Sequence, residues 1–289
     1  MKKIFFMLCA GTATLSYGEE IPKGIPRIRE GNLALKTSQQ PGPLFSFGQN
    51  TVDKGDLVVY SLFDRRKGIN KKNTEVSPSL VYGVTNKFSF FLSIPVAIKL
   101  QLNDTCSSGI EDMFIAGEYI LHEKETLSYQ NNITFIGTII FPTGSTKKQP
   151  PTSINSPGFF MGLCATHLAT DWYLFASPGV LLSGKHNGIK FGNQFFYEFG
   201  FGKNLAYKED SFIFSLILEF DGIYGKRNKV CNICDPNSGG NIFTIGPSLW
   251  FSTQHLILQA GIAFPLAQHL NGVQNKDKYV AAFNIGWTF

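Results

Sequence analysis

Two cysteines separated by two residues, Cys231 and Cys234, are the most recognisable chemical motif of this 289-residue chain. The CxxC spacing supplies two thiolates, which is half of the four-ligand set of a structural zinc site. The other cysteines, Cys9, Cys106 and Cys164, do not form a second such pair. We therefore expect no metal site. In an exported chain we favour a disulfide in the loop that carries Cys231 and Cys234, although spacing leaves the pairing open.

Serine and histidine could supply the nucleophile and the base of a hydrolase, and a third group would have to orient the base. Ser183 and His186 are three residues apart, and His269 lies in another polar segment. His167 and His255 stand beside short turns instead. No third group can be assigned to any of these histidines. We therefore predict that the chain is not an enzyme and uses no metal or organic cofactor.

The N-terminus has the features of an export signal. Met1–Lys3 is basic, Ile4–Ala13 is apolar, and Ser16–Gly18 places small residues where a signal peptidase reads them. We predict a signal peptide over 1–18. The formal net charge of +5 includes that basic start, and no concentrated basic face is evident in the remainder, so no nucleic-acid partner is expected.

The rest of the chain reads as strands, because no apolar run approaches the roughly 20 residues that a transmembrane helix needs. Residues 88–102 place eight apolar side chains on one face and smaller or polar ones on the other. The same period of two recurs in 189–204, 211–225 and 255–265. These segments have ten or more residues, the length of a tilted membrane crossing, whereas strands of a soluble sandwich are about half as long.

The last residues of the chain form such a strand with an aromatic ring at each end. Tyr279, Phe283, Trp287 and Phe289 share its apolar face. Rings at both ends are typical of a strand that crosses a bilayer, because aromatic side chains gather at both interfaces. A terminal Phe also resembles the last strand of bacterial outer-membrane barrels, which implies the barrel-assembly machinery as a partner.

These patterns predict an all-β fold, a transmembrane antiparallel up-and-down β-barrel of about twelve strands over 55–289. The strands are expected at about 56–66, 74–84, 88–101, 109–121, 127–141, 156–169, 172–184, 189–204, 211–225, 241–252, 255–265 and 279–289. Short connections generally alternate with longer, more polar ones, which indicates periplasmic turns and extracellular loops. Because an open sheet edge in hydrocarbon leaves N–H and C=O groups unpaired, 279–289 should pair with the first strand.

Residues 19–54 precede the barrel and contain several prolines. Leu44–Phe47 is an apolar stretch of this segment and a candidate for insertion. Two interpretations stay open: the segment inserts into the barrel as a plug, or it is a disordered periplasmic lead.

Alternation also predicts which side chains face the lumen. The candidate lumen-lining residues are the charged Lys99, Asp112, Glu118, Lys190, Glu198, Glu219 and Asp221 and the aromatic Phe91, Phe114, Tyr173, Phe175 and Phe196. The charged groups would either line a water-filled path or pair into a network that fills a narrow barrel. The aromatic groups would either guide an aromatic solute or block the lumen.

Several short segments are similar, in their order, to one known family. Gly109–Asp112 resembles a Gly-x-x-Asp strand start, Ile139–Gly144 a strand end that runs into a long loop, and Ser156–Gly158 and Lys54–Asp56 the starts of two other crossings. Together they resemble the outer-membrane barrel family named for the MetA pathway of phenol degradation. The resemblance covers most of the chain after the signal peptide and implies uptake of small, often aromatic, hydrophobic compounds. It supplies no catalytic residues.

We therefore predict a barrel in the bacterial outer membrane, in contact with outer-membrane lipid, that passes small hydrophobic or aromatic solutes by passive diffusion. The first alternative is a structural or adhesive surface barrel whose outer loops, such as 142–155 and 226–240, do the work. A less favoured alternative is an outer-membrane lipid hydrolase.

Overall fold

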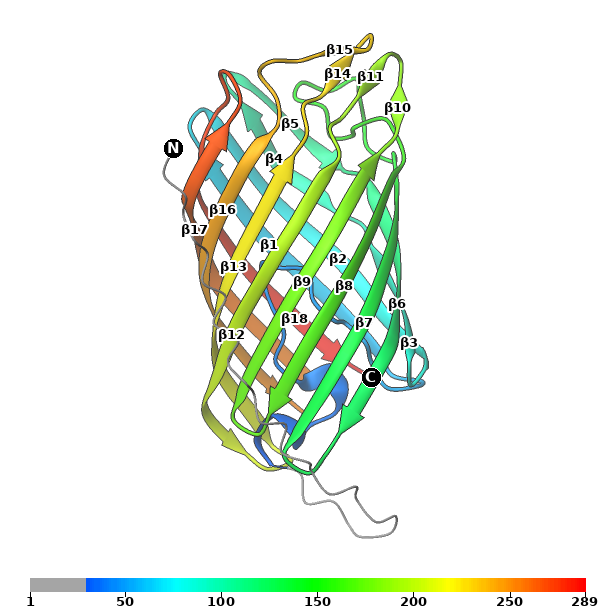
Figure 1. Cartoon of the computed structure of the whole chain (residues 1–289), viewed down its shortest axis with the longest axis vertical. Helices are drawn as coiled ribbons and strands as arrows, with labels where there is room; N and C mark the ends of the chain where they lie inside the picture. Colours follow the sequence, from blue (N-terminus) through cyan, green and yellow to red (C-terminus); the bar gives the residue numbers. More distant parts are fainter. Residues whose placement is uncertain (1–29) are drawn as a thin grey trace, which may run out of the picture.

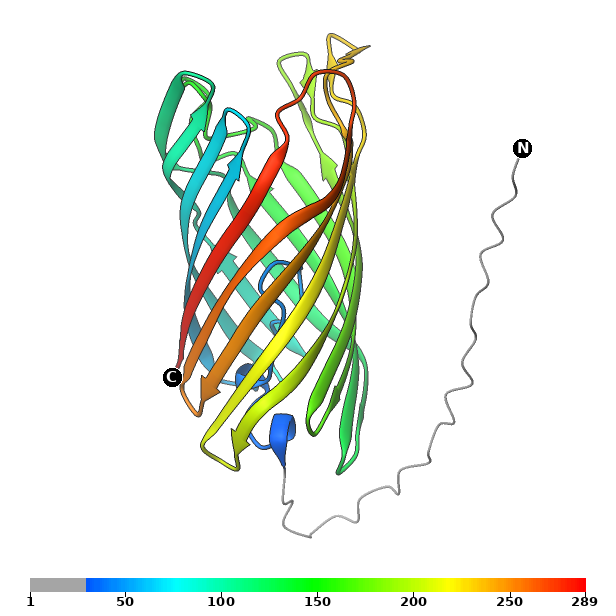
Figure 2. The ribbon, with the colours of Figure 1, turned by 90° about the vertical axis from the view of Figure 1, so that its left-hand side faces the viewer.

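The computed structural model describes residues 30–289, and the signal peptide expected over 1–18 lies outside them. The described chain forms a closed antiparallel barrel of twelve crossings (Figures 1 and 2), which confirms the predicted fold class. The wall strands are β1 (Leu57–Gly68), β2 (Lys71–Thr85), β3 (Phe88–Ser93), β4 (Val96–Leu102), β5 (Thr105–Ile110), β6 (Met113–Glu125), β7 (Tyr129–Phe141), β8 (Gly158–Ala169), β9 (Trp172–Ser183), β12 (Gln194–Lys208), β13 (Phe212–Gly225), β16 (Gly240–Thr253), β17 (Leu256–Leu270) and β18 (Asp277–Thr288). Within these residues, no helix is long and apolar enough to span a membrane.

The first and last strands close the sheet, as predicted. β1 pairs with β18 from Val58 opposite Thr288 to Lys67 opposite Tyr279, and its other edge pairs with β2. The backbone N–H of Phe289 donates to the carbonyl of Leu57 at 2.9 Å and completes the seam. Because neighbouring crossings pair all round the wall, the sheet has no lateral edge in the hydrocarbon.

The outer face of the wall is apolar, and the inner face is mixed. Leu216 of β13, for example, keeps 44% of its side chain exposed, whereas its neighbours Ser215 and Ile217 are buried on the other side. Large exposed apolar residues recur in the same way on every crossing. A closed barrel with an apolar outer belt is the form in which strands cross a membrane, and it places the protein in the bacterial outer membrane.

The third and fourth crossings are each divided, at Ile94-Pro95 and at Glu111-Asp112. Below this break β3 pairs with β6, and above it β4 pairs with β5. Pro95 has no N–H to give to a neighbouring strand, so the regular ladder is interrupted there. The N–H of Glu111 donates to the Pro95 carbonyl at 2.9 Å and bridges the break.

A β-bulge in β4 corrects the prediction that Lys99 faces the lumen. Ala97 pairs with Glu75 and Lys99 pairs with Thr74, so Ile98 is an extra residue without a partner on β2. One extra residue reverses the alternation beyond it. Lys99 therefore shares the outer face of the wall with Thr74 and is exposed.

The prediction that Lys190 faces the lumen is wrong, because Lys190 belongs to a small sheet above the wall. This sheet contains β10 (Lys185–His186), β11 (Ile189–Lys190), β14 (Lys229–Val230) and β15 (Ile233–Cys234), which pair in that order. The barrel strand expected from residue 189 begins only at Gln194, because a tight Asn187-Gly188 turn with positive φ at both residues makes a hairpin first. Lys190 is thus an exposed loop residue rather than a lumen residue.

The same small sheet separates the two cysteines of the CxxC motif. Cys231 lies in the turn between β14 and β15, whereas Cys234 pairs across the hairpin with Lys229. Both are exposed free thiols in the structure. The disulfide that we favoured in this loop is therefore not present in this structure.

The inward and outward assignments predict unequal effects of a new charge. Leu216→Lys should destabilise the folded barrel by about 2 kcal/mol or more, because a lipid-facing Lys loses its hydration. Ser93→Lys should cost far less, since Ser93 borders an internal cavity. Urea titration of the barrel in lipid vesicles measures both, with Leu216→Met as the control for side-chain shape. Equal losses for the two Lys variants would contradict the assignment.

Candidate functional site

Residues 30–56, here called the inner segment, lie inside the barrel (Figure 2). The side chain of Asn32 donates to the carbonyl of Ala169 after β8 at 2.9 Å, and Ser252 of β16 donates to the carbonyl of Gln39 at 2.7 Å. Thr134 of β7 donates to the side chain of Gln49 at 3.0 Å. A segment that contacts strands all round the wall must occupy the lumen.

The inner segment enters at the periplasmic end, rises to an apex at Leu44–Phe47 and returns to the start of β1. At the apex, Glu219 of β13 accepts three backbone N–H donors, from Leu44 at 2.9 Å, Phe45 at 2.9 Å and Ser46 at 3.0 Å. Ser248 of β16 donates to the same carboxyl at 2.9 Å. Glu219 is fully buried, so these four donors replace the water that its carboxyl would otherwise bind.

Three more inward acids hold the apex and Asn50, which follows it. Glu198 of β12 accepts the N–H of Phe47 at 2.8 Å, and Asp221 of β13 accepts the hydroxyl of Ser46. Glu118 of β6 accepts both the backbone N–H of Asn50 at 2.7 Å and its side-chain amide at 3.0 Å. From Leu44 to Asn50 the irregular backbone of the segment has no sheet partner, and these carboxyl groups accept its N–H donors.

Glycines of the wall leave room for the two apex phenylalanines. A Cβ atom at Gly246 would lie 2.7 Å from the ring of Phe45, and one at Gly261 would lie 2.9 Å from it. A Cβ atom at Gly162 would lie 2.8 Å from the ring of Phe47. Any larger residue at these lumen positions would therefore displace the apex.

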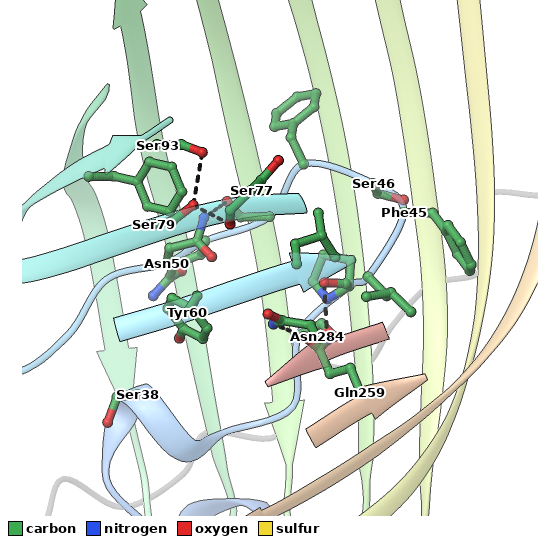
Figure 3. A pocket seen from close by; sticks show the side chains of 18 of the residues that line it. Ser38, Phe45, Ser46, Asn50, Tyr60, Ser77, Ser79, Ser93, Gln259 and Asn284 are labelled. Carbon is green, nitrogen blue, oxygen red and sulfur yellow. Dashed lines mark hydrogen bonds between the residues drawn. The ribbon is translucent and has the colours of Figure 1, made fainter. Parts of the chain in front are cut away.

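A cavity of about 450 Å³ lies between the inner segment and the wall (Figure 3). Hydroxyl groups line one side, where Ser79 donates to Ser93 at 2.8 Å. Aromatic rings line another, where Phe91 and Phe114 stack with centroids 5.6 Å apart. The volume suits a small organic molecule, and the lining offers both a ring surface and polar partners. A second cavity of about 300 Å³ lies on the other side of Leu44 and Phe45.

The remaining predicted aromatic residues are packed rather than open. Tyr173 and Phe175 are buried in a cluster with Leu33 of the inner segment and Leu168. Phe196 contacts Phe47, with ring centroids 6.4 Å apart, and also borders the second cavity. Only Phe91 and Phe114 of the predicted aromatic set border the larger cavity.

Asp112 lies at the break in the fourth crossing and anchors an outer loop. Its carboxyl accepts the backbone N–H of Gly144 at 3.1 Å and of Ile154 at 3.0 Å. These donors come from the two ends of the 142–155 loop. Asp112 therefore fixes that loop to the wall and is not one of the carboxyl groups around the apex.

The histidines and Ser183 do not assemble a hydrolytic site. His167 contacts Asn131 at 2.6 Å, and His255 contacts the carbonyl of Thr288 at 2.9 Å. Within residues 30–289, no hydrogen bond joins a histidine to a serine side chain, and His186 lies exposed on β10. The described residues also contain no group of three or more metal-ligating side chains.

Sequence reasoning missed several residues of the larger cavity. Tyr60, Glu75 and Ser77 line it, and Asp64 and Arg66 line the second cavity. The alternation of β1 and β2 marks all five as inward, so the signal was present. Alternation also places Gln259 and Asn284 on the inner face, but their mutual hydrogen bond at 2.7 Å and their contact with the inner segment are evident only in the structure.

Comparison with known proteins agrees with this architecture. Residues 74–268 match the family described as "Putative MetA-pathway of phenol degradation". The chain is similar in structure to the COG4313 outer membrane channel from Pseudomonas putida F1, at a TM-score of 0.68 and 11% identity, over 86% of this chain and 100% of that one. It is also similar to the NanC porin, at a TM-score of 0.51 and 9% identity, over 80% and 98% of the two chains. No curated protein matches the sequence.

From the contacts at the apex, we predict that Glu219→Gln weakens the hydrogen bonds that hold the apex to β13. The amide group of Gln places an N–H where backbone donors point, and hydrogen bonds to a carboxylate contribute about 1.5–3 kcal/mol each. Hydrogen exchange at the N–H groups of Leu44, Phe45 and Ser46 should become about ten-fold faster or more. Asp171→Asn, which removes an ion pair with Lys203 at a periplasmic turn, is the control and should leave these rates unchanged. Unchanged exchange in Glu219→Gln would contradict the role of this carboxyl group.

Proposed function

The chain belongs to the family described as "Putative MetA-pathway of phenol degradation", and on that premise we propose that it is a channel for passive diffusion of small aromatic or hydrophobic solutes. One observation carries the proposal: the lumen is filled by a separate segment of chain rather than by side chains of the wall alone. A segment that enters from one end can leave a path when it moves. The similarity to proteins named as a channel and a porin supports the same class of function.

The two parts of the inner segment are held by different forces. Near the periplasmic end, Leu35 and Val52 are buried with Val58, Ile213 and other apolar residues of the wall. At the apex, carboxyl groups accept the backbone N–H groups of Leu44 to Phe47, bonds that water can replace, while the rings of Phe45 and Phe47 pack against the wall. Apolar burial anchors the periplasmic part of the segment, here called its base, because exposing these apolar side chains to water would cost free energy. We therefore infer that the apex moves while the base stays fixed, which opens the lumen without releasing the segment.

The lining of the larger cavity supports a class of solute. The stacked rings of Phe91 and Phe114 offer a surface to an aromatic ring, and Ser77, Ser79 and Ser93 offer partners to a hydroxyl group. A small aromatic molecule that carries hydroxyl groups would use both. The printed name of the family points to the same chemistry.

A structural or adhesive barrel is the second candidate, because the inner segment also serves to fill and stiffen a barrel of this size. Contacts of the outer loops favour it: Asp112 fixes the 142–155 loop to the wall, and four short strands form the outer sheet. The two candidates differ in whether solutes cross.

Planar-bilayer recordings should distinguish them. We expect the native protein to conduct, and the double variant Glu198→Gln/Glu219→Gln to spend more time open, because four hydrogen bonds of the apex are weakened. Glu209→Gln makes the same chemical change at an exposed periplasmic turn and should behave as the native protein. Absence of conductance and of solute flux from both the native protein and the double variant would favour the structural barrel.

The aromatic pair should determine the preference among solutes. Phe91→Leu and Phe114→Leu keep the cavity apolar but remove the ring surface. In liposome-swelling assays, each should slow the entry of phenol-like solutes several-fold relative to aliphatic alcohols of equal size, since ring stacking contributes about 0.5–1.5 kcal/mol. Phe63→Leu, on the lipid-facing side of β1, is the matched control. An equal effect on both solute classes would contradict the assignment.

A further inference from the structure

Four basic residues gather on the outside of the barrel near its extracellular end. Arg65 and Lys67 lie on β1, Lys72 on β2 and Lys99 on β4. Their alternate neighbours on β1 and β2, such as Asp64 and Glu75, line the internal cavities, so the basic side chains point away from the lumen. We call Arg65, Lys67, Lys72 and Lys99 the outer basic patch.

Strand pairing brings these four residues together. Lys67 pairs directly with Lys72, and Arg65 and Lys99 both pair with Thr74, which lies between them. Arg65, Lys67 and Lys99 are each close enough to Lys72 to interact with it electrostatically. Lys99 belongs to the group only because the bulge at Ile98 turns it outward.

The patch lies at the height of the outer lipid headgroups. The row below it, Phe63, Val76 and Val96, is apolar and ends the lipid-facing belt on these three strands. Arg65 is eight residues beyond the start of β1 at Leu57. With a rise of about 3.3 Å per residue and a tilt of about 40°, this is about 20 Å along the barrel axis. The apolar band of such barrels is about 25 Å tall, so Arg65 lies about 5 Å below its upper edge, and its long side chain can reach the headgroups.

The positive charge of the patch is not balanced by the protein. Among residues 30–289, none of the four side chains has an ion pair, and the nearest acids in sequence, Asp64 and Glu75, face the lumen. Like charges directly opposite each other on neighbouring strands are destabilising. An anion from outside the chain would remove that repulsion.

We propose that the outer basic patch binds the phosphate groups of lipid A, the phosphorylated glycolipid of the outer leaflet. Arg65 offers a planar fork of donors to a phosphate, and the three lysines offer point charges around it. Ile98, 56% exposed beside Lys99, and Phe63, 42% exposed below Arg65, are placed to contact acyl chains. Charge above and apolar surface below match a lipid with a phosphorylated head. This site is independent of solute passage through the lumen.

Native mass spectrometry of the purified protein in detergent tests the proposal, with lipid A titrated against the native protein and the variant Arg65→Gln/Lys67→Gln/Lys72→Gln/Lys99→Gln. We expect the variant to bind lipid A about ten-fold more weakly or worse, because each basic residue near a lipid surface adds to the attraction. The matched control removes one Arg and three Lys from the extracellular loops, as Lys185→Gln/Lys190→Gln/Arg227→Gln/Lys229→Gln, and should bind as the native protein does.

Further arms identify the chemical group that is recognised. Enzymatically dephosphorylated lipid A should bind the native protein as weakly as lipid A binds the patch variant, whereas inorganic phosphate alone should not compete at millimolar concentration. If the quadruple variant does not fold, Lys72→Glu alone should still weaken binding. Equal binding of lipid A to native and patch proteins, equal loss in the loop control, or equal binding of phosphatidylglycerol would each overturn the proposal.

Discussion

The need to pair every backbone polar group governs this molecule on both sides of its wall. In the hydrocarbon there is no water to accept an N–H or to donate to a C=O, so the sheet must close on itself. β1 and β18 pair without interruption from Val58 opposite Thr288 to Lys67 opposite Tyr279, and the N–H of Phe289 completes the seam. Inside the barrel the same requirement falls on the irregular inner segment. The N–H donors around its apex have no strand to pair with, and inward carboxyl groups accept them instead.

These hydrogen bonds between inward carboxyl groups and the inner segment explain why acids are buried in the lumen. Glu118, Glu198 and Glu219 are nearly or fully inaccessible, which would be costly for a carboxyl group without partners. Each accepts at least one backbone N–H of the inner segment. The wall and the segment therefore depend on each other. The carboxyl groups accept the N–H donors of the segment, and these donors replace the water that the carboxyl groups lose on burial. The two roles considered from sequence, a water-filled lining or a network of wall charges, did not include this pairing with the inner segment.

Local departures from regular pairing determine the chemistry of the outside. Pro95 interrupts the ladder between the third and fourth crossings, and the bulge at Ile98 follows within the same stretch. The bulge moves one cation, Lys99, from the lumen face to the outer face beside Arg65 and Lys72. A one-residue bulge thus removes a positive charge from the lumen face and adds it to the outer face, because the side-chain period of a strand is two.

The sequence by itself determined the barrel, its approximate strand boundaries and the seam, because lipid on one side and a mixed lumen on the other impose a period of two on every crossing. It also identified the acids that now surround the apex, since alternation is a local property. The tertiary structure alone decided what those acids bind, because the path of the inner segment depends on contacts with strands far away in the chain. It alone decided the positions of Lys99 and Lys190, because one bulge and one hairpin shifted the alternation and the start of a strand. Local pattern sets which way a strand faces, and only long-range pairing sets where that pattern is interrupted.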